Sequence, residues 1–285
     1  MLIELRFSSW KNRSHSGLAA RRYWRFGFEL SVEAIPPLFL FVQMAVSRQT
    51  DSFNEMKPLR KKSVEFLIRS SHQLRASPIV KYSALSLFAD RFLPSLTTLI
   101  KTRNMIRSWL LRSMEESNLQ LFSLISIWIS SKIHDSRALS VKCLKSLGDE
   151  FIKDQHFTIR DFVEAEVVFL QVLNFEIGIS NVTFIFLEEF FIQFKGVAKV
   201  GGLVSFEACM DMMDLLYEKE ETSLLFSAPR SLAASILVAS YVVTVPKQQW
   251  EFPVLPWVKF VTSYKEEDIG EKVKDILTHV FEPHS

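Results

Sequence analysis

The chain has 285 residues, and its 34 Lys and Arg against 32 Asp and Glu give a formal net charge of +2. This near-neutral balance argues against a protein that works by neutralising phosphates, while 48% hydrophobic residues are ample for a buried core. Cys143 and Cys209 lie in apolar helical patterns without a C-x-x-C spacing or a nearby His. They therefore form neither a disulfide framework nor a zinc site, and they indicate a reducing compartment.

The sequence carries no motif for catalysis or phosphate binding. It has no G-x-G-x-x-G, phosphate loop, H-E-x-x-H or G-x-S-x-G, and its six His are dispersed. The adjacent carboxylates Glu188-Glu189 and Glu220-Glu221 point in different directions on a helix, so they do not form an acid/base pair. We expect no enzyme activity of the chain's own, no cofactor and no metal site.

Residues 1–55 differ from the rest in composition. Basic residues are scattered among Ser and aromatic residues, as in a transit peptide. The apolar run Ile35 to Val46 is too short to span a bilayer and is interrupted by Pro36 and Pro37, so we expect no membrane partner. We interpret residues 1–55 as a poorly ordered N-terminal extension, either an appendage or an upstream translation artefact, and expect folding to start near Lys57.

Two helices are predicted next. Residues 59–70 (LRKKSVEFLIRS) place apolar and small residues on one face and basic residues on the other, which is typical of an amphipathic helix. In residues 78–93, Ser77 is the expected N-cap, Pro78 the first helical residue and Pro94 the stop. Asp90 and Arg91 lie among apolar residues of this helix, so one of the two charges must face the packed side and needs a partner.

Residues 118–132 (NLQLFSLISIWISSK) are apolar all round, which predicts a helix buried on every side. Ser117 and Gln120 have the spacing of a capping box, so we expect the helix to start at Ser117. Small side chains form one strip, which is either a docking groove or tight internal packing: Ser123, Ser126 and Ser130. Lys132 lies in the last turn, where the helix dipole favours a cation.

A short helix over residues 141–147, stopped by Gly148, and a longer one from Thr158 to about Leu173 are predicted next. In the longer helix Glu166 lies on a face that is otherwise apolar. The other residues of this face are Ile159, Phe162, Val163, Phe169, Leu170 and Leu173. A carboxylate there is costly unless it lies at a rim or accepts hydrogen bonds. A rim Glu held by water or by an internal Lys explains the pattern equally well.

The pattern starts again from Asn181. An aromatic stripe ends at Gly196, a Met-rich helix begins near Phe206, and Pro229 opens SLAASILVASYVV, a second helix with many small residues. An amphipathic helix over residues 269–280 ends the chain. Each half therefore has a small-residue helix in third place.

Three motifs in order resemble the cyclin box: Asp90-Arg91-Phe92-Leu93, then Leu119-Gln120-Leu121 with Ser131-Lys132, then Ala165-Glu166 followed by residues 169–175 (FLQVLNF). Within the cyclins, residues 119–132, 206–219 and 245–257 resemble the divergent J-type of plants. The resemblance implies an all-α protein with the cyclin fold of two stacked five-helix lobes. The expected domains are a cyclin box over residues 56–178 and a cyclin-like lobe over residues 179–285.

The resemblance also implies roles for individual residues. Lys132 and Glu166 correspond to the pair by which cyclins grip the regulatory helix of a kinase, and the strip of Ser123, Ser126 and Ser130 would belong to the same surface. Arg60 corresponds to the Arg that forms a structural ion pair with Asp90. Leu59 and Phe66 match two positions of a patch that docks substrate proteins, while Ser63 replaces an apolar residue of that patch.

The function implied is that of a cyclin: a regulatory subunit that forms a heterodimer with a cyclin-dependent serine/threonine protein kinase and activates it, in cell-cycle control and cell division. Its expected location is the nucleus, the cytoplasm or both, and no nucleic acid is expected as a partner. Two other readings stay open. One is a cyclin-fold adaptor in transcription or nucleic-acid binding; the other is a helical scaffold without kinase activation.

Overall fold

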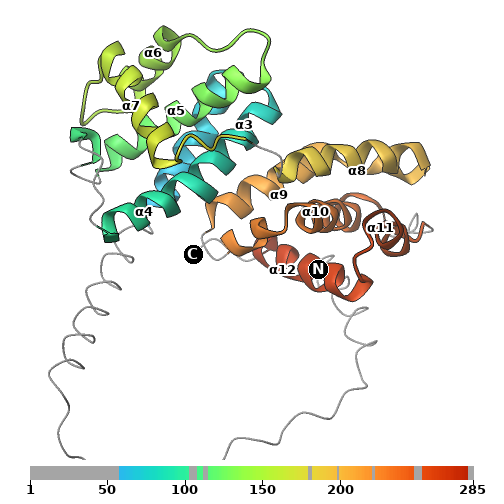
Figure 1. The fold of residues 1–285 in the computed structure, drawn as a ribbon. Coiled ribbons are helices and arrows are strands. Elements are labelled where there is room, and N and C mark those ends of the chain that lie inside the picture. The colour runs from blue at the N-terminus through green and yellow to red at the C-terminus, as the bar shows by residue number, and fades with distance from the viewer. Residues whose placement is uncertain are drawn as a thin grey trace, which may run out of the picture. The chain divides into compact units, whose positions relative to one another are not determined.

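The computed structural model describes residues 58–102, 108–111, 115–178, 182–197, 199–219, 222–246 and 252–281, and these are helices and short connections (Figure 1). All of them lie in one compact unit, residues 49–285. The expectation for residues 1–55 falls outside the described residues.

The first lobe is built around one buried helix. Its elements are a helix over residues 58–73, α3 (Pro78–Leu85), η1 (Ser86–Phe92), α4 (Leu93–Thr102), η2 (Trp109–Leu111), α5 (Glu116–His134), α6 (Val141–Phe151) and α7 (Ile159–Val172). Every residue of α5 from Ser117 to Ser131 except Gln120 is buried, because α3, α6, α7 and η1 pack around it. The expectation that this helix is buried on all sides is confirmed.

The second lobe repeats this plan around α10 (Pro229–Thr244). Its other elements are α8 (Thr183–Val197), η3 (Lys199–Leu203), α9 (Phe206–Glu218), η4 (Ser223–Ser227), α11 (Val254–Thr262) and α12 (Glu266–Phe281). Helix α10 packs against α8, α9, α11 and α12, and its Ser and Ala residues allow those helices to approach closely. Both predicted small-residue helices therefore form lobe centres. Each is the third helix of its lobe when the continuous run α3–η1–α4 is counted as one helix and the short 3-10 turns η2, η3 and η4 are left out.

Three predicted helix boundaries are wrong. Pro94 does not stop the chain, because η1 is a π-helix in which the Leu93 N–H bonds to the Phe88 carbonyl, and the wider turn admits the proline ring before α4 continues. Helix α5 begins at Glu116, and the Ser117 hydroxyl donates to Gln155 instead of forming a capping box. Helix α6 runs past Gly148 to Phe151.

Gly201, in η3, is needed for packing. A Cβ at this position would lie 2.6 Å from the Phe194 carbonyl oxygen and 2.9 Å from the Cα of Lys195, so only a glycine lets η3 approach the backbone of α8 this closely. Helix α11 was not predicted from the sequence; Pro253 lies at its N-cap. It ends at Ser263, whose φ of 64° is the left-handed conformation that commonly ends helices.

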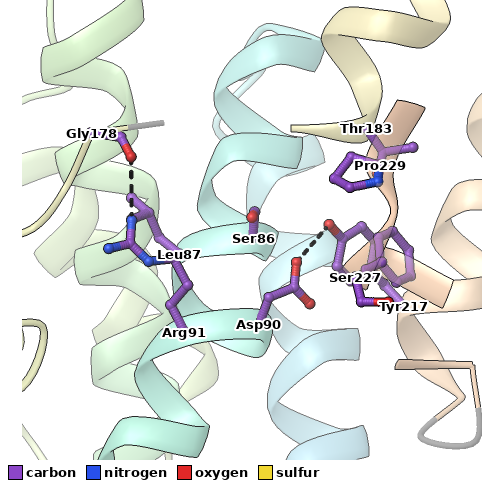
Figure 2. A pocket seen from close by; sticks show the side chains of 10 residues that line it. Ser86, Leu87, Asp90, Arg91, Gly178, Thr183, Tyr217, Ser227 and Pro229 are labelled. Atoms are coloured by element: carbon purple, nitrogen blue, oxygen red, sulfur yellow. Dashed lines mark hydrogen bonds between the residues drawn. The ribbon is translucent and has the colours of Figure 1, made fainter. Parts of the chain in front are cut away.

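One face of α9 joins the second lobe to the first. Asp214 forms an ion pair of 2.5 Å with Lys81 of α3, and the Met210 carbonyl accepts a hydrogen bond from the Tyr82 hydroxyl. Tyr217, one turn further along, donates its hydroxyl to Asp90 of η1 (Figure 2). Because these α9 residues lie three or four positions apart, they share one side of the helix.

No helix in the described part of the chain is both long and apolar enough to cross a bilayer. Among the same residues, His, Cys, Asp and Glu side chains nowhere gather in threes at a distance that would hold a metal ion.

Candidate functional site

Lys132 and Glu166 meet at the surface of the first lobe. The Lys132 Nζ lies 2.5 Å from Glu166 Oε1, and the two side chains keep 38% and 20% of their surface exposed. The same ammonium lies 3.6 Å from the ring centroid of Trp128. Lys132 therefore sits between an aromatic face and a carboxylate, which limits its rotamers while leaving the charge accessible.

Trp128 was expected only as a core residue. It precedes Lys132 by one helical turn on α5, it is 8% exposed, and its indole N–H donates to the Leu139 carbonyl at 3.0 Å. The hydrogen bond to Leu139 holds the indole in place, and the face of its ring positions the Lys132 ammonium. The spacing of four residues between an aromatic and a cation on one helix was the available sequence signal.

The end of α5 that carries Lys132 is tied to α3. Ser77 donates its hydroxyl to Asp135 at 3.2 Å, and Ser83 lies 2.8 Å from the Nε2 of His134. Burial lowers the pKa of His134, so the imidazole is neutral at pH 7. These contacts place the last turn of α5 relative to the first lobe.

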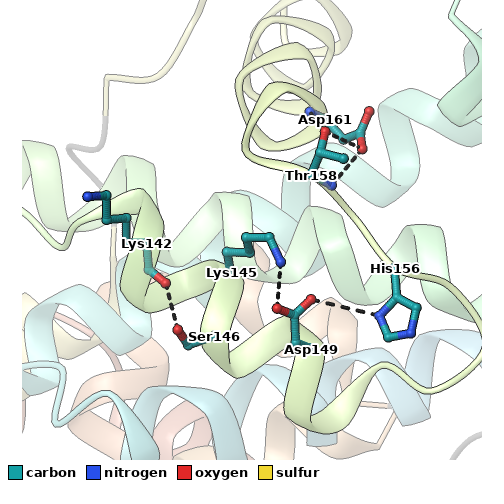
Figure 3. Close-up of polar contacts among 7 residues, drawn as sticks. All are labelled: Lys142, Lys145, Ser146, Asp149, His156, Thr158 and Asp161. Carbon is teal, nitrogen blue, oxygen red and sulfur yellow. Dashed lines mark hydrogen bonds and ion pairs between the residues drawn. The ribbon is translucent and has the colours of Figure 1, made fainter.

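The start of α7 is set by a capping box. The Thr158 hydroxyl accepts from the Asp161 N–H, and the Asp161 carboxylate accepts from the Thr158 N–H, which confirms Thr158 as the cap (Figure 3). The preceding loop is linked to α6 through Asp149, which lies 2.5 Å from the Lys145 ammonium and 3.9 Å from the His156 ring. The hydrogen bond from Lys145 lowers the pKa of Asp149.

Beside Glu166, α7 presents an exposed apolar row. Ile159, Val163 and Val167 follow one another at four-residue steps and are 41%, 48% and 46% exposed. Ile133, next to Lys132, is 43% exposed. The sequence pattern predicts that Ile159 and Val163 share the face of Phe162 and Phe169. The structure corrects this prediction, because the buried residues of α7 are Phe162, Ala165, Val168, Phe169 and Val172. We call Ile159, Val163 and Val167 the apolar row.

The serine strip is not part of this surface. Ser123, Ser126 and Ser130 are fully buried, and Ser123 donates to the Leu119 and Ser63 carbonyls. Of the two alternatives, tight internal packing is therefore correct: the strip faces other helices of the lobe, and a partner cannot touch it. The expected assignment of these serines to a kinase-binding surface is wrong for this reason.

Arg60 and Asp90 meet at Tyr217. The Arg60 guanidinium donates to the Tyr217 carbonyl at 3.2 Å, and Asp90 accepts from the Tyr217 hydroxyl at 3.2 Å. Burial raises the pKa of Asp90 to about 7, although hydrogen bonds from Ser86 and Tyr217 and the charge of Arg60 act in the opposite direction. Both residues of the expected ion pair thus contribute to the junction between the lobes, with a tyrosine between them.

The expected substrate-docking patch is not accessible as predicted. Phe66 is 7% exposed and belongs to the core, and Leu59 is half-buried against it. Ser63, between them, is fully buried and donates to the Leu59 carbonyl. Phe66 and Ser63 thus lie on the packed face of this helix and Leu59 at its half-buried edge, so the predicted patch has little exposed surface in this structure.

Comparisons with known proteins agree with this architecture. The family model for the cyclin N-terminal domain matches residues 40–178, beginning inside the segment that we had expected to lie outside the domain. Cyclin-J18 of Arabidopsis thaliana is 59% identical over 231 residues, covering 81% of this chain and 98% of that protein. The chain belongs to the cyclin family. A Cyclin-J18-like protein of rice is 50% identical over 229 residues, covering 79% of this cyclin and 88% of its relative.

The fold is also that of a cyclin of known structure. The crystal structure of a viral cyclin from herpesvirus saimiri superposes with a TM-score of 0.59 at 16% identity, covering 79% of this cyclin and 86% of the viral chain. At such low identity the likeness concerns the fold alone. The all-α cyclin fold and the resemblance to J-type plant cyclins are thereby confirmed.

Proposed function

We propose that this cyclin is the regulatory subunit of a cyclin-dependent serine/threonine protein kinase, which it binds as a heterodimer and activates. The observation that carries the proposal is the accessible Lys132–Glu166 pair beside the apolar row. Exposed apolar side chains bordered by charge mark protein interaction sites, and a surface of this kind suits an amphipathic helix of a partner.

The mechanism requires no chemistry from this chain. In protein kinases a lysine must pair with the glutamate of a mobile helix before the ATP phosphates are held correctly. A partner helix whose apolar side packs on Val163 and Val167 and whose polar groups engage Lys132 and Glu166 would be held inward. The kinase supplies every catalytic group, so the cyclin is not itself an enzyme.

The preformed ion pair affects the energetics of binding. Because Lys132 is already held by Trp128 and Glu166, little side-chain entropy remains to be lost when a partner docks. A stable heterodimer of this class buries on the order of 2,000 Å² or more in total, so the apolar row would be the centre of a larger contact. We further propose that the complex acts in cell-cycle control in the nucleus, the cytoplasm or both.

Binding and activation are tested together. The full chain is mixed with each member of a panel of recombinant cyclin-dependent kinases, and we measure co-elution and phosphate transfer from ATP to a serine/threonine peptide. We expect at least one kinase to co-elute and to gain activity over the kinase alone. The same assay with Lys132→Glu is expected to lose both signals.

Lys274→Glu is the matched control, since Lys274 is an exposed lysine on α12 in the other lobe. It should behave as the unaltered chain. If no kinase of the panel co-elutes, the proposed kinase binding is refuted. If a kinase binds without gaining activity, the proposed activation is refuted.

A further inference from the structure

The connection between α5 and α6 is bound back to α5 at Leu139. The Leu139 N–H donates to the Ser131 hydroxyl oxygen at 3.1 Å, and the Leu139 carbonyl accepts from the Trp128 indole N–H at 3.0 Å. The Ser131 hydroxyl donates in turn to the Trp128 carbonyl at 2.8 Å, so it serves both as donor and as acceptor. Leu139 is therefore fixed at two points on the last two turns of α5.

This set of hydrogen bonds reaches the surface through Trp128. The edge of its indole is bonded to Leu139, and the Lys132 ammonium lies 3.6 Å from the centroid of its ring. A tryptophan side chain has only two rotatable torsions, so one hydrogen bond at its edge is sufficient to fix the ring. Lys132 has a flexible four-carbon stem, and it takes its position from that fixed ring and from Glu166.

Lys132 is the member of this group that a partner can reach. Ser131 is fully buried and Trp128 is 8% exposed, whereas the Lys132 side chain keeps 38% of its surface exposed. Leu139 takes part in these hydrogen bonds through its backbone. An effect of Ser131, Trp128 or Leu139 on a partner must therefore pass through the position of Lys132.

We propose that Trp128 is a positioning residue for the Lys132–Glu166 surface, and that the α5–α6 connection sets the affinity of this surface for its partner through Leu139 and Trp128. This role rests on the proposed kinase binding. While Leu139 holds the indole, Lys132 stays in the geometry that a partner helix meets. If the connection moves, the indole loses its hydrogen bond and Lys132 is free to rotate. A partner must then restrict the lysine at a cost in conformational entropy.

The first test needs no kinase. The full chain is prepared with isotope-labelled lysine, and the ε-methylene resonance of Lys132 is assigned from Lys132→Arg. Because the Lys132 ammonium lies over the indole, ring currents should move this resonance upfield of that of Lys274, an exposed lysine. Trp128→Leu should return it to the position of Lys274. Trp128→Phe keeps an aromatic face but cannot donate to Leu139, so a smaller upfield shift should remain.

The connection itself can be loosened without altering any side chain of the group. Residues 136–138, which precede Leu139, are exposed, and exposed loops tolerate insertions. Two glycines inserted after Arg137 should release Leu139 and move the Lys132 resonance toward that of an exposed lysine. The same insertion after Tyr264, in the connection between α11 and α12, is the matched control and should leave the resonance unchanged.

The second test measures the dissociation constant of the kinase that co-elutes with the unaltered chain. Trp128→Leu should raise it about tenfold, because the lysine loses both its aromatic contact and its fixed position. Trp128→Phe and the glycine insertion should raise it by smaller factors, in the order of their resonance shifts. Trp257→Leu, which removes an indole packed on Phe194 in the other lobe, is the control and should leave it unchanged. Circular dichroism melting reports the fold of each variant.

Kinase binding should also act back on the connection, because the coupling between two sites is reciprocal. The Leu139 amide hydrogen should exchange with solvent more slowly in the complex than in the free chain. The Cys143 amide, which donates to the Ser140 hydroxyl at the start of α6, is the internal control and should exchange at the same rate in both. An unchanged rate at Leu139 would show that the connection is not coupled to binding.

Three other results would overturn the proposed role. The first is a Lys132 resonance in the unaltered chain at the position of an exposed lysine. The second is a glycine insertion that changes neither the resonance nor the affinity. The third is weaker binding by Trp128→Leu with an unchanged Lys132 resonance, which would make Trp128 a structural residue only. If no kinase co-elutes, the proposed function fails, and the resonance measurements still decide whether Trp128 and the connection position Lys132.

Discussion

The Lys132 ammonium and the Glu166 carboxylate are 34 positions apart in the chain, yet they lie 2.5 Å from each other on adjacent helices. Both stay accessible to solvent. An ion pair at such a surface contributes at most about 1 kcal/mol to folding, so the pair is better understood by what it offers to a partner than by what it adds to stability.

Charge reversal tests this pair. Lys132→Glu and Glu166→Lys each place like charges together, while the double variant restores an ion pair with its ends exchanged. We expect all three to melt within a few degrees of the unaltered chain, because the pair contributes little to stability. We expect all three to lose kinase co-elution. Binding retained by the double variant would contradict the assigned surface.

The apolar row can be tested without changing charge. Val163→Ser together with Val167→Ser removes apolar contact area at two exposed positions, so the free energy of unfolding should change by no more than about 0.5 kcal/mol per site. The free energy of binding to the kinase should become less favourable by about 2 kcal/mol or more if these residues are central to the contact. Ile192→Ser is the matched control, since Ile192 is 65% exposed on α8 of the other lobe.

The Lys81–Asp214 ion pair should matter more for folding than the exposed pair. Its side chains are 9% and 18% exposed, and it joins the lobes. Lys81→Met leaves a largely buried carboxylate without its cation, so we expect a loss of about 3 kcal/mol in urea unfolding. The double variant Lys81→Met/Asp214→Leu should recover part of that loss. A double variant as unstable as the single one would indicate that packing, not charge, holds this contact.

The stability of the lobe junction should depend on pH through Asp90. Its pKa of about 7 in the folded chain lies above the ordinary value of 3.8, so the folded state binds more protons than the unfolded state between these two values. Stability is therefore highest below pH 4 with respect to this group, and falls as pH rises toward 7, by at most about 4 kcal/mol. Asp90→Asn should remove this fall, as measured by urea unfolding at pH 5 and pH 8.

Ser130 gives a prediction of the opposite sign to most core substitutions. Its hydroxyl is buried and lacks a hydrogen-bond partner among the described residues. Ser130→Ala removes an unsatisfied polar group and should stabilise the chain by about 1 kcal/mol, with kinase binding unchanged. Ser126→Ala is the control: its hydroxyl donates to the Ser123 carbonyl at 2.7 Å, so the same change there should be neutral or destabilising.

Local sequence patterns determined where most helices lie and which two of them form the lobe centres. The all-round apolar pattern of residues 119–129 could only be a buried helix, and the Ser and Ala positions after Pro229 predicted the second lobe centre. Thr158 and Pro229 correctly predicted where two helices begin. A helix start depends on the capping residue and its close neighbours in the chain, so the local sequence is sufficient to predict it. The motifs around Asp90, Lys132 and Glu166 were sufficient to recognise the family.

Tertiary structure alone decided which faces are free. Ser123, Ser126, Ser130 and Phe66 have the same local pattern whether their face meets solvent or another helix, and the packing of the first lobe buries them. Ile159 and Val163 have the spacing of a core face, yet both are exposed, because α7 packs against α5 with a different side of the helix. Burial depends on contacts between segments far apart in the chain, and helical periodicity reports only the arrangement of residues around a single axis.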